Sequence, residues 1–324
     1  MADYKGIKGF KVQYLSADPS DPIIGQTWYN STSKDLKYTG ATAAGAWATG
    51  NNMNTARYAL GGTGIQTAAL AFGGSVPPYT GATEEYDGNS WTSSNSLNTT
   101  RSTLSGAGTQ TAGLAFGGYD GTANTGATEE YDGNSWATSP GSFNTARREL
   151  AGAGTQTAGL AFGGYGTAST GATEEYDGIS WTTSGSLNTA RNFLGGAGTQ
   201  TAGLAFGGYI TAVTAATELY DGSTWTSNPT GLNTARFGLA GCGTQTSALA
   251  FGGDLPPTTG ATEQYDGTSW TSTTSMSTTR YLLAKAGTQA LALGFGGDTG
   301  TAVLAATEEW TGAGAALTKT ITVS

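Results

Sequence analysis

Short, glycine-rich apolar stretches alternate with polar turns along most of the chain. The expected strands of one such stretch are Leu104–Gly108, Thr111–Phe116, Ala127–Tyr131 and a fourth strand that starts near Trp136. Thr109-Gln110 and Asp132-Gly133 lie between them as tight turns, and an Asp-Gly pair between two strands is a strong hairpin signal. Strands this short, with turns this regular, predict an all-β fold.

The same pattern recurs six times. The chain repeats an arginine, a Phe-Gly-Gly and a tryptophan, and the first two series both step by 44, 46, 44, 45 and 44 residues. The members are Arg57, Arg101, Arg147, Arg191, Arg236 and Arg280; Phe72, Phe116, Phe162, Phe206, Phe251 and Phe295; and Trp47, Trp91, Trp136, Trp181, Trp225 and Trp270. Internal repeats of this length indicate a propeller or a solenoid.

Four marks of each unit together resemble the kelch family. They are a Gly-Gly that closes the second strand, a tyrosine that ends the third, a tryptophan about five residues later, and an arginine that opens the next unit. The resemblance covers roughly residues 38–312 and implies a kelch-type β-propeller with four-stranded blades. The last unit departs from it, since Glu308-Glu309-Trp310-Thr311-Gly312 is followed by no spaced tryptophan.

That departure predicts how the ring closes. The segment Tyr38–Trp47 reads as a fourth strand without its own unit, so we expect it to complete the last blade and leave no unpaired edge. This gives an all-β, six-bladed propeller at 38–312, preceded by an arm and hairpin at 1–37 and followed by a strand or tail at 313–324. Two alternatives stay open: the tail Leu317–Ser324 competes for the closing position, or residues 26–47 build a partial seventh blade.

Composition narrows the chemistry. Charged residues make up 11% of the 324 residues, 53 are glycine, the net charge is −9, and histidine is absent. Without histidine a copper oxidase site is excluded, and the acidic body argues against nucleic-acid binding. The single cysteine, Cys242, is expected to be a buried small residue. The sequence contains no run of about 18 apolar residues, so we expect no membrane insertion. We therefore expect no enzyme activity, cofactor or metal.

Most charged residues belong to the repeat. Adjacent carboxylates such as Glu84 and Glu85 point to opposite faces of a strand, so they do not converge on one substrate. We expect one glutamate of each pair to meet a repeat arginine between or within blades, and a bidentate, partly buried pair of this kind would hold blade to blade. The inter-blade set is Arg57, Arg101, Arg147, Arg191, Arg236, Arg280, Glu84, Glu85, Glu129, Glu130, Glu174 and Glu175. The repeated tyrosines and tryptophans are expected to fill the space between blades.

The loops between the second and third strands vary, whereas the rest of the unit does not. In a propeller these loops share one face with the connections between blades. Four tyrosines, Tyr79, Tyr119, Tyr165 and Tyr209, are therefore expected on that face, as candidate ligand-binding residues. Tyrosine-bearing loops on a rigid scaffold suit recognition of glycans or proteins.

The first 37 residues differ from the repeats. Asp18-Pro-Ser-Asp-Pro22 predicts an extended stretch, and Gly25–Tyr38 predicts a hairpin. That hairpin, with the low-charge repeat array, is similar to structural proteins of tailed bacteriophages and to kelch-like tail or fibre proteins of marine phages. The resemblance implies a virion component, made in the host cytoplasm without a signal peptide. It would bind other virion proteins through residues 1–37 and form a homo-oligomer in the particle.

A second function is compatible with the first. The loop face would act as a lectin-like module that recognises a host surface glycan or receptor. An epimerase or hydrolase would need unique converging polar groups, which the repeated acids do not supply. A cellular protein-interaction module of the kelch type lacks an accompanying adaptor domain in this sequence.

Overall fold

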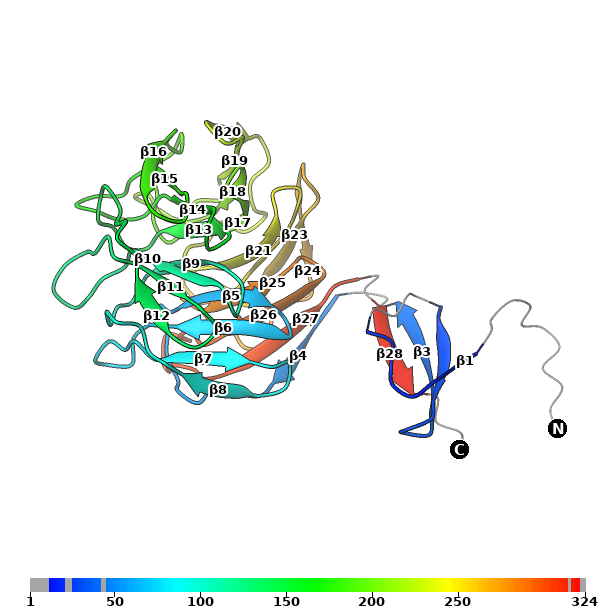
Figure 1. Ribbon diagram of the computed structural model, residues 1–324. Coiled ribbons are helices and arrows are strands. Elements are labelled where there is room, and N and C mark those ends of the chain that lie inside the picture. The colour runs from blue at the N-terminus through cyan, green and yellow to red at the C-terminus, as the bar shows by residue number, and fades with distance from the viewer. Residues whose placement is uncertain (1–11, 21–24, 42–44, 314–315, 321–324) are drawn as a thin grey trace, which may run out of the picture. The chain divides into compact units, whose positions relative to one another are not determined.

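The computed structural model describes residues 12–20, 25–41, 45–313 and 316–320, and those residues contain no helix. By contacts between Cα atoms the chain forms two compact units. The larger unit is Trp47–Trp310, and the smaller one joins Met1–Ala46 to Thr311–Ser324. The all-β expectation is confirmed (Figure 1).

The larger unit is built from six four-stranded antiparallel sheets, which we call blades 1 to 6. Blade 1 contains β5 (Gly61–Ile65), β6 (Ala68–Phe72), β7 (Thr83–Tyr86) and β8 (Trp91–Ser94); blade 2 contains β9 (Ser105–Gly108), β10 (Gly113–Phe116), β11 (Thr128–Tyr131) and β12 (Trp136–Thr138); blade 3 contains β13 (Ala151–Gly154), β14 (Gly159–Phe162), β15 (Thr173–Tyr176) and β16 (Trp181–Ser184). Blade 4 contains β17 (Gly195–Thr199), β18 (Ala202–Phe206), β19 (Thr217–Tyr220) and β20 (Trp225–Asn228); blade 5 contains β21 (Ala240–Thr244), β22 (Ser247–Phe251), β23 (Thr262–Tyr265) and β24 (Trp270–Thr273); blade 6 contains β25 (Ala284–Gly287), β26 (Leu291–Phe295), β27 (Thr307–Thr311) and β4 (Ala46–Gly50).

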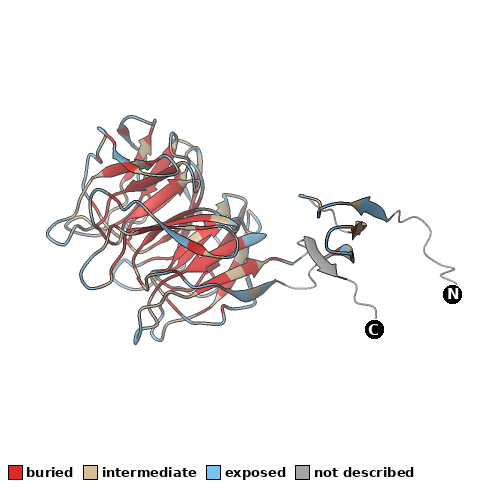
Figure 2. Cartoon of the chain, turned by 60° about the horizontal axis from the view of Figure 1, so that its bottom comes forward, coloured by how far each residue is buried: buried red, intermediate tan, exposed pale blue. Residues whose placement is uncertain are grey.

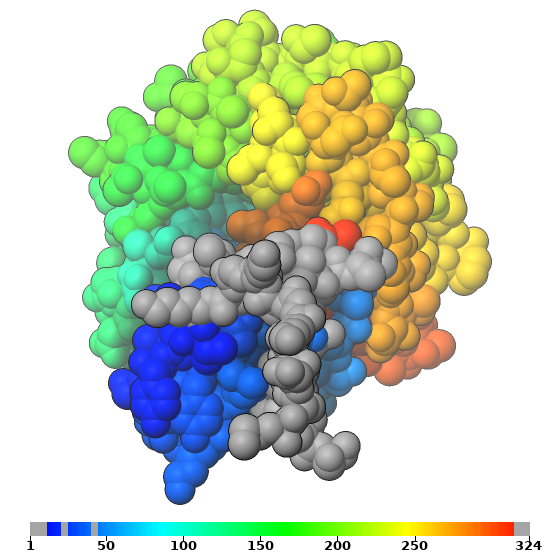
Figure 3. Space-filling model, turned by 90° about the vertical axis from the view of Figure 1, so that its right-hand side faces the viewer, coloured from blue at the N-terminus to red at the C-terminus, as the bar shows by residue number. Residues whose placement is uncertain are grey.

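The first strand of every blade lies at the centre of a closed ring. β5 contacts β9, and the contacts continue through β13, β17, β21 and β25 back to β5. The ring is therefore a six-bladed β-propeller. Each blade except the last is one continuous stretch of chain, so the colours of the propeller in Figure 3 pass through green, yellow and orange in sequence order.

An N-terminal strand closes the ring, as the sequence predicted. The fourth strand of blade 6 is β4, which hydrogen-bonds to β27 from the other end of the chain. Its bounds, Ala46–Gly50, differ from those of the expected strand Tyr38–Trp47, because Asp35–Ala41 forms β3 in another sheet. Trp47 sets the position of β4, since its indole Nε1 donates to Thr262 Oγ1 of blade 5 at 3.0 Å.

The smaller unit is a sheet in the order β1 (Gln13–Leu15), β2 (Thr27–Asn30), β3 (Asp35–Ala41) and β28 (Ala316–Thr320). β2 and β3 form the hairpin expected at Gly25–Tyr38. The C-terminal strand β28 pairs antiparallel with β3, so it does not occupy the closing position of blade 6. The hairpin proposed for a seventh blade belongs to this sheet, in which β1 and β2 run parallel. The expected boundaries at 37 and 312 thus differ from this division, and residues 1–11 lie outside the described part of the chain.

Asp18 ties the first segment of the smaller unit to its hairpin. Its carboxylate accepts from the fully buried Trp28 Nε1 at 3.0 Å and pairs with Lys37 Nζ at 2.7 Å. The hydrogen bond from Lys37 is the main reason why the pKa of Asp18 falls to about 2. Asp21 and Pro22, the end of the predicted extended stretch, lie outside the described residues.

The strands of the propeller are largely buried (Figure 2), and their side chains form core clusters between neighbouring blades. Phe116 of blade 2 packs on Trp181 of blade 3, with ring centroids 5.1 Å apart, in a buried cluster that also holds Leu114 and Tyr176. Equivalent clusters join the other neighbours around the ring. The expectation that the aromatic rings fill the space between blades agrees with this packing. Each blade contacts mainly its two neighbours, as in other repeat folds.

Candidate binding face

The repeat arginines are structural in every blade. Arg101 is fully buried, and its Nη2 donates to Glu129 Oε1 on β11 at 3.0 Å, while its Nη1 donates to Gly117 O at 3.1 Å. Burial lowers the pKa of Arg101 to about 10, and the charge of Glu129 opposes that shift. The other carboxylate oxygen, Oε2, accepts from the backbone N–H of Asn98 at 2.6 Å. Both Nη atoms and both carboxylate oxygens are therefore occupied, whereas the buried Nε of Arg101 has no hydrogen-bond partner among the described residues.

Five further pairs repeat this arrangement. They are Arg57–Glu84, Arg147–Glu174, Arg191–Glu218, Arg236–Glu263 and Arg280–Glu308. The pairs decide between the two expected arrangements, since each lies within one blade. They differ from the expectation in that each joins the guanidinium to one carboxylate oxygen, because the backbone of the preceding linker takes the other. The arginine connects blades through its main chain instead: Gly74 N of blade 1 donates to Arg101 O at 2.9 Å.

The second glutamate of each pair does lie between blades. Tyr131 of blade 2 donates its hydroxyl to Glu85 of blade 1, and Tyr176 donates to Glu130 at 2.6 Å. Burial is the main cause that raises the pKa of Tyr131 and Tyr176 to about 12. Where the next blade has Trp310 in place of tyrosine, the glutamate position holds Gln264. Blade 4 has Leu219 at this position although the next blade keeps Tyr265, whose hydroxyl accepts from Asn228 Nδ2 instead.

Two further interblade contacts were missed by the sequence reasoning. Each repeat tryptophan donates its indole N–H to the threonine that begins the third strand of the preceding blade, as Trp181 does to Thr128 Oγ1 at 2.8 Å. Each glutamine of the first turn donates to two carbonyls of the preceding blade, as Gln156 does to Gly113 O and Tyr131 O. Their exact periodicity was the available signal, but only the structure identifies their partners.

A ring of main-chain hydrogen bonds surrounds the central channel at the loop face. Two residues after each repeat arginine, the N–H of one blade donates to the carbonyl of the equivalent residue in the preceding blade, over distances of 2.7–2.9 Å. We call these six residues the mouth ring: Ala59, Thr103, Glu149, Phe193, Gly238 and Leu282. All have φ between 50° and 62°, a left-handed conformation that costs an L-residue about 1–2 kcal/mol.

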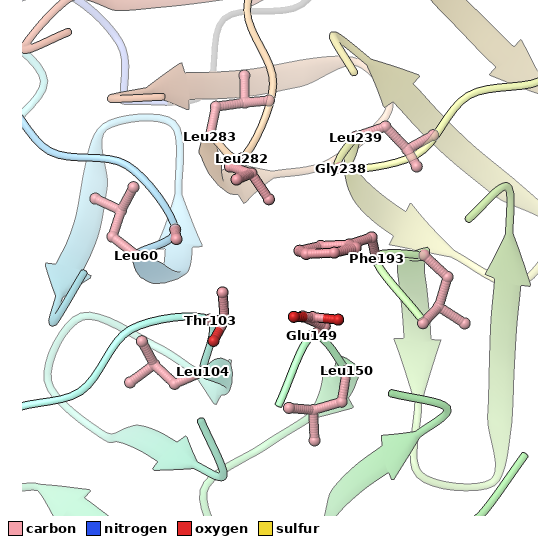
Figure 4. A pocket seen from close by; sticks show the side chains of 12 residues that line it. Leu60, Thr103, Leu104, Glu149, Leu150, Phe193, Gly238, Leu239, Leu282 and Leu283 are labelled. Carbon is pink, nitrogen blue, oxygen red and sulfur yellow. The ribbon is translucent and has the colours of Figure 1, made fainter. Parts of the chain in front are cut away.

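The mouth ring holds six different side chains on one repeated backbone. In Figure 4, Thr103, Glu149 and Phe193 project toward the centre of the ring, inside the circle of leucines that follow them in sequence. Non-glycine residues with this backbone cluster at functional sites. Sequence reasoning missed these positions, although their variation beside an invariant arginine was visible in the six aligned units.

The four predicted tyrosines do lie on this face, but the structure does not bring all of them together. The rings of Tyr79 and Tyr119 are 5.7 Å apart and nearly perpendicular. The guanidinium of Arg148 lies 5.1 Å from the ring centroids of both Tyr119 and Tyr165. We call these four residues the tyrosine–arginine cluster. Tyr209 belongs to another group, with its ring 5.8 Å from that of Phe237.

A hollow of about 410 Å³ joins this cluster to the mouth ring. Its lining includes Tyr79, Tyr119, Arg148, Glu149 and Phe193. Arg148 Nε donates to Glu149 Oε1 at 2.8 Å. Glu149 Oε2 also accepts from Asn192 Nδ2 at 2.6 Å. The hollow thus combines aromatic ring surfaces with a positioned, nearly charge-neutral set of hydrogen-bonding groups.

Other chemistry has little support in the described part of the chain. No group of three or more His, Cys, Asp or Glu side chains there is arranged to hold a metal ion. Cys242 is buried, its Sγ donates to Thr288 O at 3.5 Å, and burial raises the pKa of its thiol to about 12. The described residues also include no helix long and apolar enough to span a bilayer.

Comparison with known proteins adds no family. No protein-family model matches the chain, and the curated proteins include no similar sequence.

Proposed function

We propose that this protein is a non-enzymatic recognition module that binds a hydroxyl-rich glycan on the loop face of its propeller. The observation that carries the proposal is the position of Arg148 against the rings of Tyr119 and Tyr165, beside the hollow. The backbone of this face repeats six times, but this cluster occurs once. Its side chains are therefore free to differ without loss of the fold.

The chemistry of the hollow favours a neutral sugar. Aromatic rings offer flat apolar surfaces to the C–H faces of a pyranose, and the hydroxyls of the lining residues Tyr58, Tyr79 and Ser102 can hydrogen-bond to a sugar. Arg148 has a side-chain exposure of 31% and is already paired with Glu149, so its charge is balanced. An anionic sugar would have to displace that glutamate.

The test is binding to a glycan array and to host cells by the full chain and single variants. Tyr119→Ala and Arg148→Ala are expected to weaken binding at least tenfold with unchanged melting temperature. Tyr209→Ala is the matched control, because Tyr209 is exposed on the same face outside the cluster. Equal binding by all four proteins, or equal loss in the Tyr209 variant, would refute the glycan site.

We further propose that the protein is a component of a phage virion, attached through its smaller unit. One observation favours this second role: both ends of the chain enter one four-stranded sheet that is separate from the propeller and exposes Val12 and Tyr14. The kelch-like repeats and the phage-like hairpin support the assignment by resemblance. Other virion proteins and further copies of this chain are the proposed partners.

Native mass spectrometry and particle incorporation test the attachment role. The double variant Val12→Ser/Tyr14→Ser removes exposed apolar surface without deleting a strand. It is expected to dissociate an oligomer or to lower incorporation into particles, while glycan binding is retained. If incorporation and oligomeric state are both unchanged, the smaller unit is not the attachment surface.

A further inference from the structure

One residue breaks the repeat on the innermost strands. Five blades carry glycine at the second position of the channel-lining segment, and blade 6 carries a lysine. The residues are Gly62, Gly106, Gly152, Gly196, Gly241 and Lys285. Among the residues that line the two inner segments of the channel, Lys285 carries the only charged side chain.

The five glycines have a clear packing reason. A Cβ atom at Gly152 would lie 2.4 Å from Phe116 Cζ of the preceding blade, and one at Gly241 would lie 2.1 Å from Phe206 Cζ. Any side chain at this position therefore requires the phenylalanine of the preceding blade to move. For Lys285 the corresponding ring is Phe251.

A second departure from the repeat makes that room. Lys285 is the cross-strand partner of Gly294, where the other five blades carry alanine. A Cβ atom at Gly294 would lie 2.9 Å from Phe251 Cε2, so the ring occupies the space that a methyl group fills elsewhere. The lysine and the glycine thus compensate each other across one pair of strands. Because Gly294 provides the space that Lys285 requires, the lysine is an integral part of the packing of blade 6.

Lys285 faces channel segments of about 100 and 110 Å³. Their walls are glycine, alanine and leucine with Thr63, Ser105 and Cys242, and neither lining includes a carboxylate. Burial lowers the pKa of the Lys285 ammonium, and Cys242 on β21 is the one titratable group that opposes this shift. Within the described residues, the ammonium has no ion pair or hydrogen bond. Lys285 is only partly buried on β25, so its ammonium remains accessible from the channel. A partly desolvated charge of this kind gains stability when a counter-charge is supplied.

We propose that Lys285 makes the central channel a binding site for a small anion, either a halide or an oxyanion such as phosphate. Lys285 supplies the charge, and the narrow channel admits only a small ion. The site lies below the mouth ring and is independent of the glycan proposal, since the tyrosine–arginine cluster shares no residue with it.

Lysine-specific NMR of the full chain tests the proposal directly. The chain has seven lysines, so ¹³Cε labelling gives seven signals, and the Lys285→Met variant identifies one of them. Titration with sodium phosphate or sodium chloride, at constant ionic strength, is expected to shift the Lys285 signal to saturation and to raise its pKa. Saturation by chloride alone identifies a halide site, and saturation by phosphate identifies an oxyanion site. A Lys285 signal that does not move with either salt, or moves linearly like the other lysines, overturns the proposal.

Thermal unfolding gives a second readout with a matched control. Lys285→Gly/Gly294→Ala restores the repeat residues at both positions. The wild type is expected to gain melting temperature saturably with the anion, because binding to the native state stabilises it. The double variant and Lys285→Met should lose this gain, with at least a tenfold weaker apparent affinity. The same anion-dependent gain in all three proteins would contradict a site at Lys285.

Discussion

Arg147 and Arg148 are neighbours in sequence but belong to two regions that follow different rules. Arg147 is fully buried in the blade interior and pairs with Glu174, as its counterparts do in every blade. Arg148 lies on the loop face, where its five counterparts are Tyr58, Ser102, Asn192, Phe237 and Tyr281. The interior repeats side chains and their partners, whereas the loop face repeats only its backbone. Variation is therefore tolerated where main-chain hydrogen bonds alone maintain the geometry.

Removing each arginine in turn should give the largest difference in stability between the two regions. Arg147→Met leaves Glu174 buried without its cation and is expected to cost about 3–5 kcal/mol of unfolding free energy. Arg148→Met removes a pair whose side chains are 31% and 9% exposed, and it should cost about 1 kcal/mol. Denaturant unfolding of both variants measures the difference. Similar losses for the two variants would show that the loop face is as constrained as the interior.

Replacing the glutamate as well should not rescue the interior. Glu174 Oε2 accepts from both Asn144 N at 2.8 Å and Asn144 Nδ2 at 2.9 Å. Asn144 Nδ2 also donates to Trp181 O at 3.2 Å, so Arg147→Met/Glu174→Leu would deprive the Asn144 backbone N–H of its partner, and it is expected to be no more stable than Arg147→Met. Recovery to wild-type stability would mean that the ion pair, and not the linker contact, is the main role of Glu174.

The Lys285–Gly294 pair of blade 6 tests how strictly the interior constrains its side chains. Gly294→Ala inserts a methyl group against Phe251 and should cost about 1–3 kcal/mol. In the Lys285→Gly background the Phe251 side chain can move back toward position 285, so Gly294→Ala should cost little there. A double-mutant cycle by denaturant unfolding measures this coupling. Additive effects would contradict the compensation.

Alkaline pH should weaken the interior before it changes the backbone of the loop face. The pKa of Tyr131, Tyr176 and Tyr220 is raised from 10.0 to about 12, mainly by burial. A raised pKa in the folded state gives stability that is complete below pH 10 and is lost as the pH rises toward 12. Burial also raises the pKa of Tyr86, Tyr265 and Tyr281, so near-ultraviolet absorbance should show at least the first three phenols ionising only with unfolding. Ionisation of all tyrosines near pH 10, with native circular dichroism retained, would contradict this prediction.

The smallest expected effect concerns the mouth ring. Ala59→Gly relieves a left-handed alanine and should stabilise the protein by about 0.5–1 kcal/mol. Ala48→Gly, at an exposed position of β4, is the control and should destabilise it by a similar amount. Thermal unfolding of the two variants gives the signs. A loss of stability in Ala59→Gly would indicate that its side chain contributes to packing.

The sequence alone determined the repeated architecture. The periodic Arg, Phe-Gly-Gly and Trp positions predicted six units, and the expected strand Ala127–Tyr131 lies within one residue of β11. The missing tryptophan of the last unit predicted closure by an N-terminal strand. These features follow from local turn chemistry and from counting, which need no knowledge of distant contacts.

Only the tertiary structure decided the rest, because it depends on residues that meet across blades. The mouth ring forms because a closed circle brings six main-chain N–H groups to six carbonyls, which no single unit contains. The tyrosine–arginine cluster joins three consecutive blades, and Gly294 is explained only by Phe251 from the neighbouring blade. The pairing of β28 with β3, in place of the last blade, was likewise settled by a contact between the two ends of the chain. Sequence spacing records which positions repeat, but packing determines which neighbours they meet.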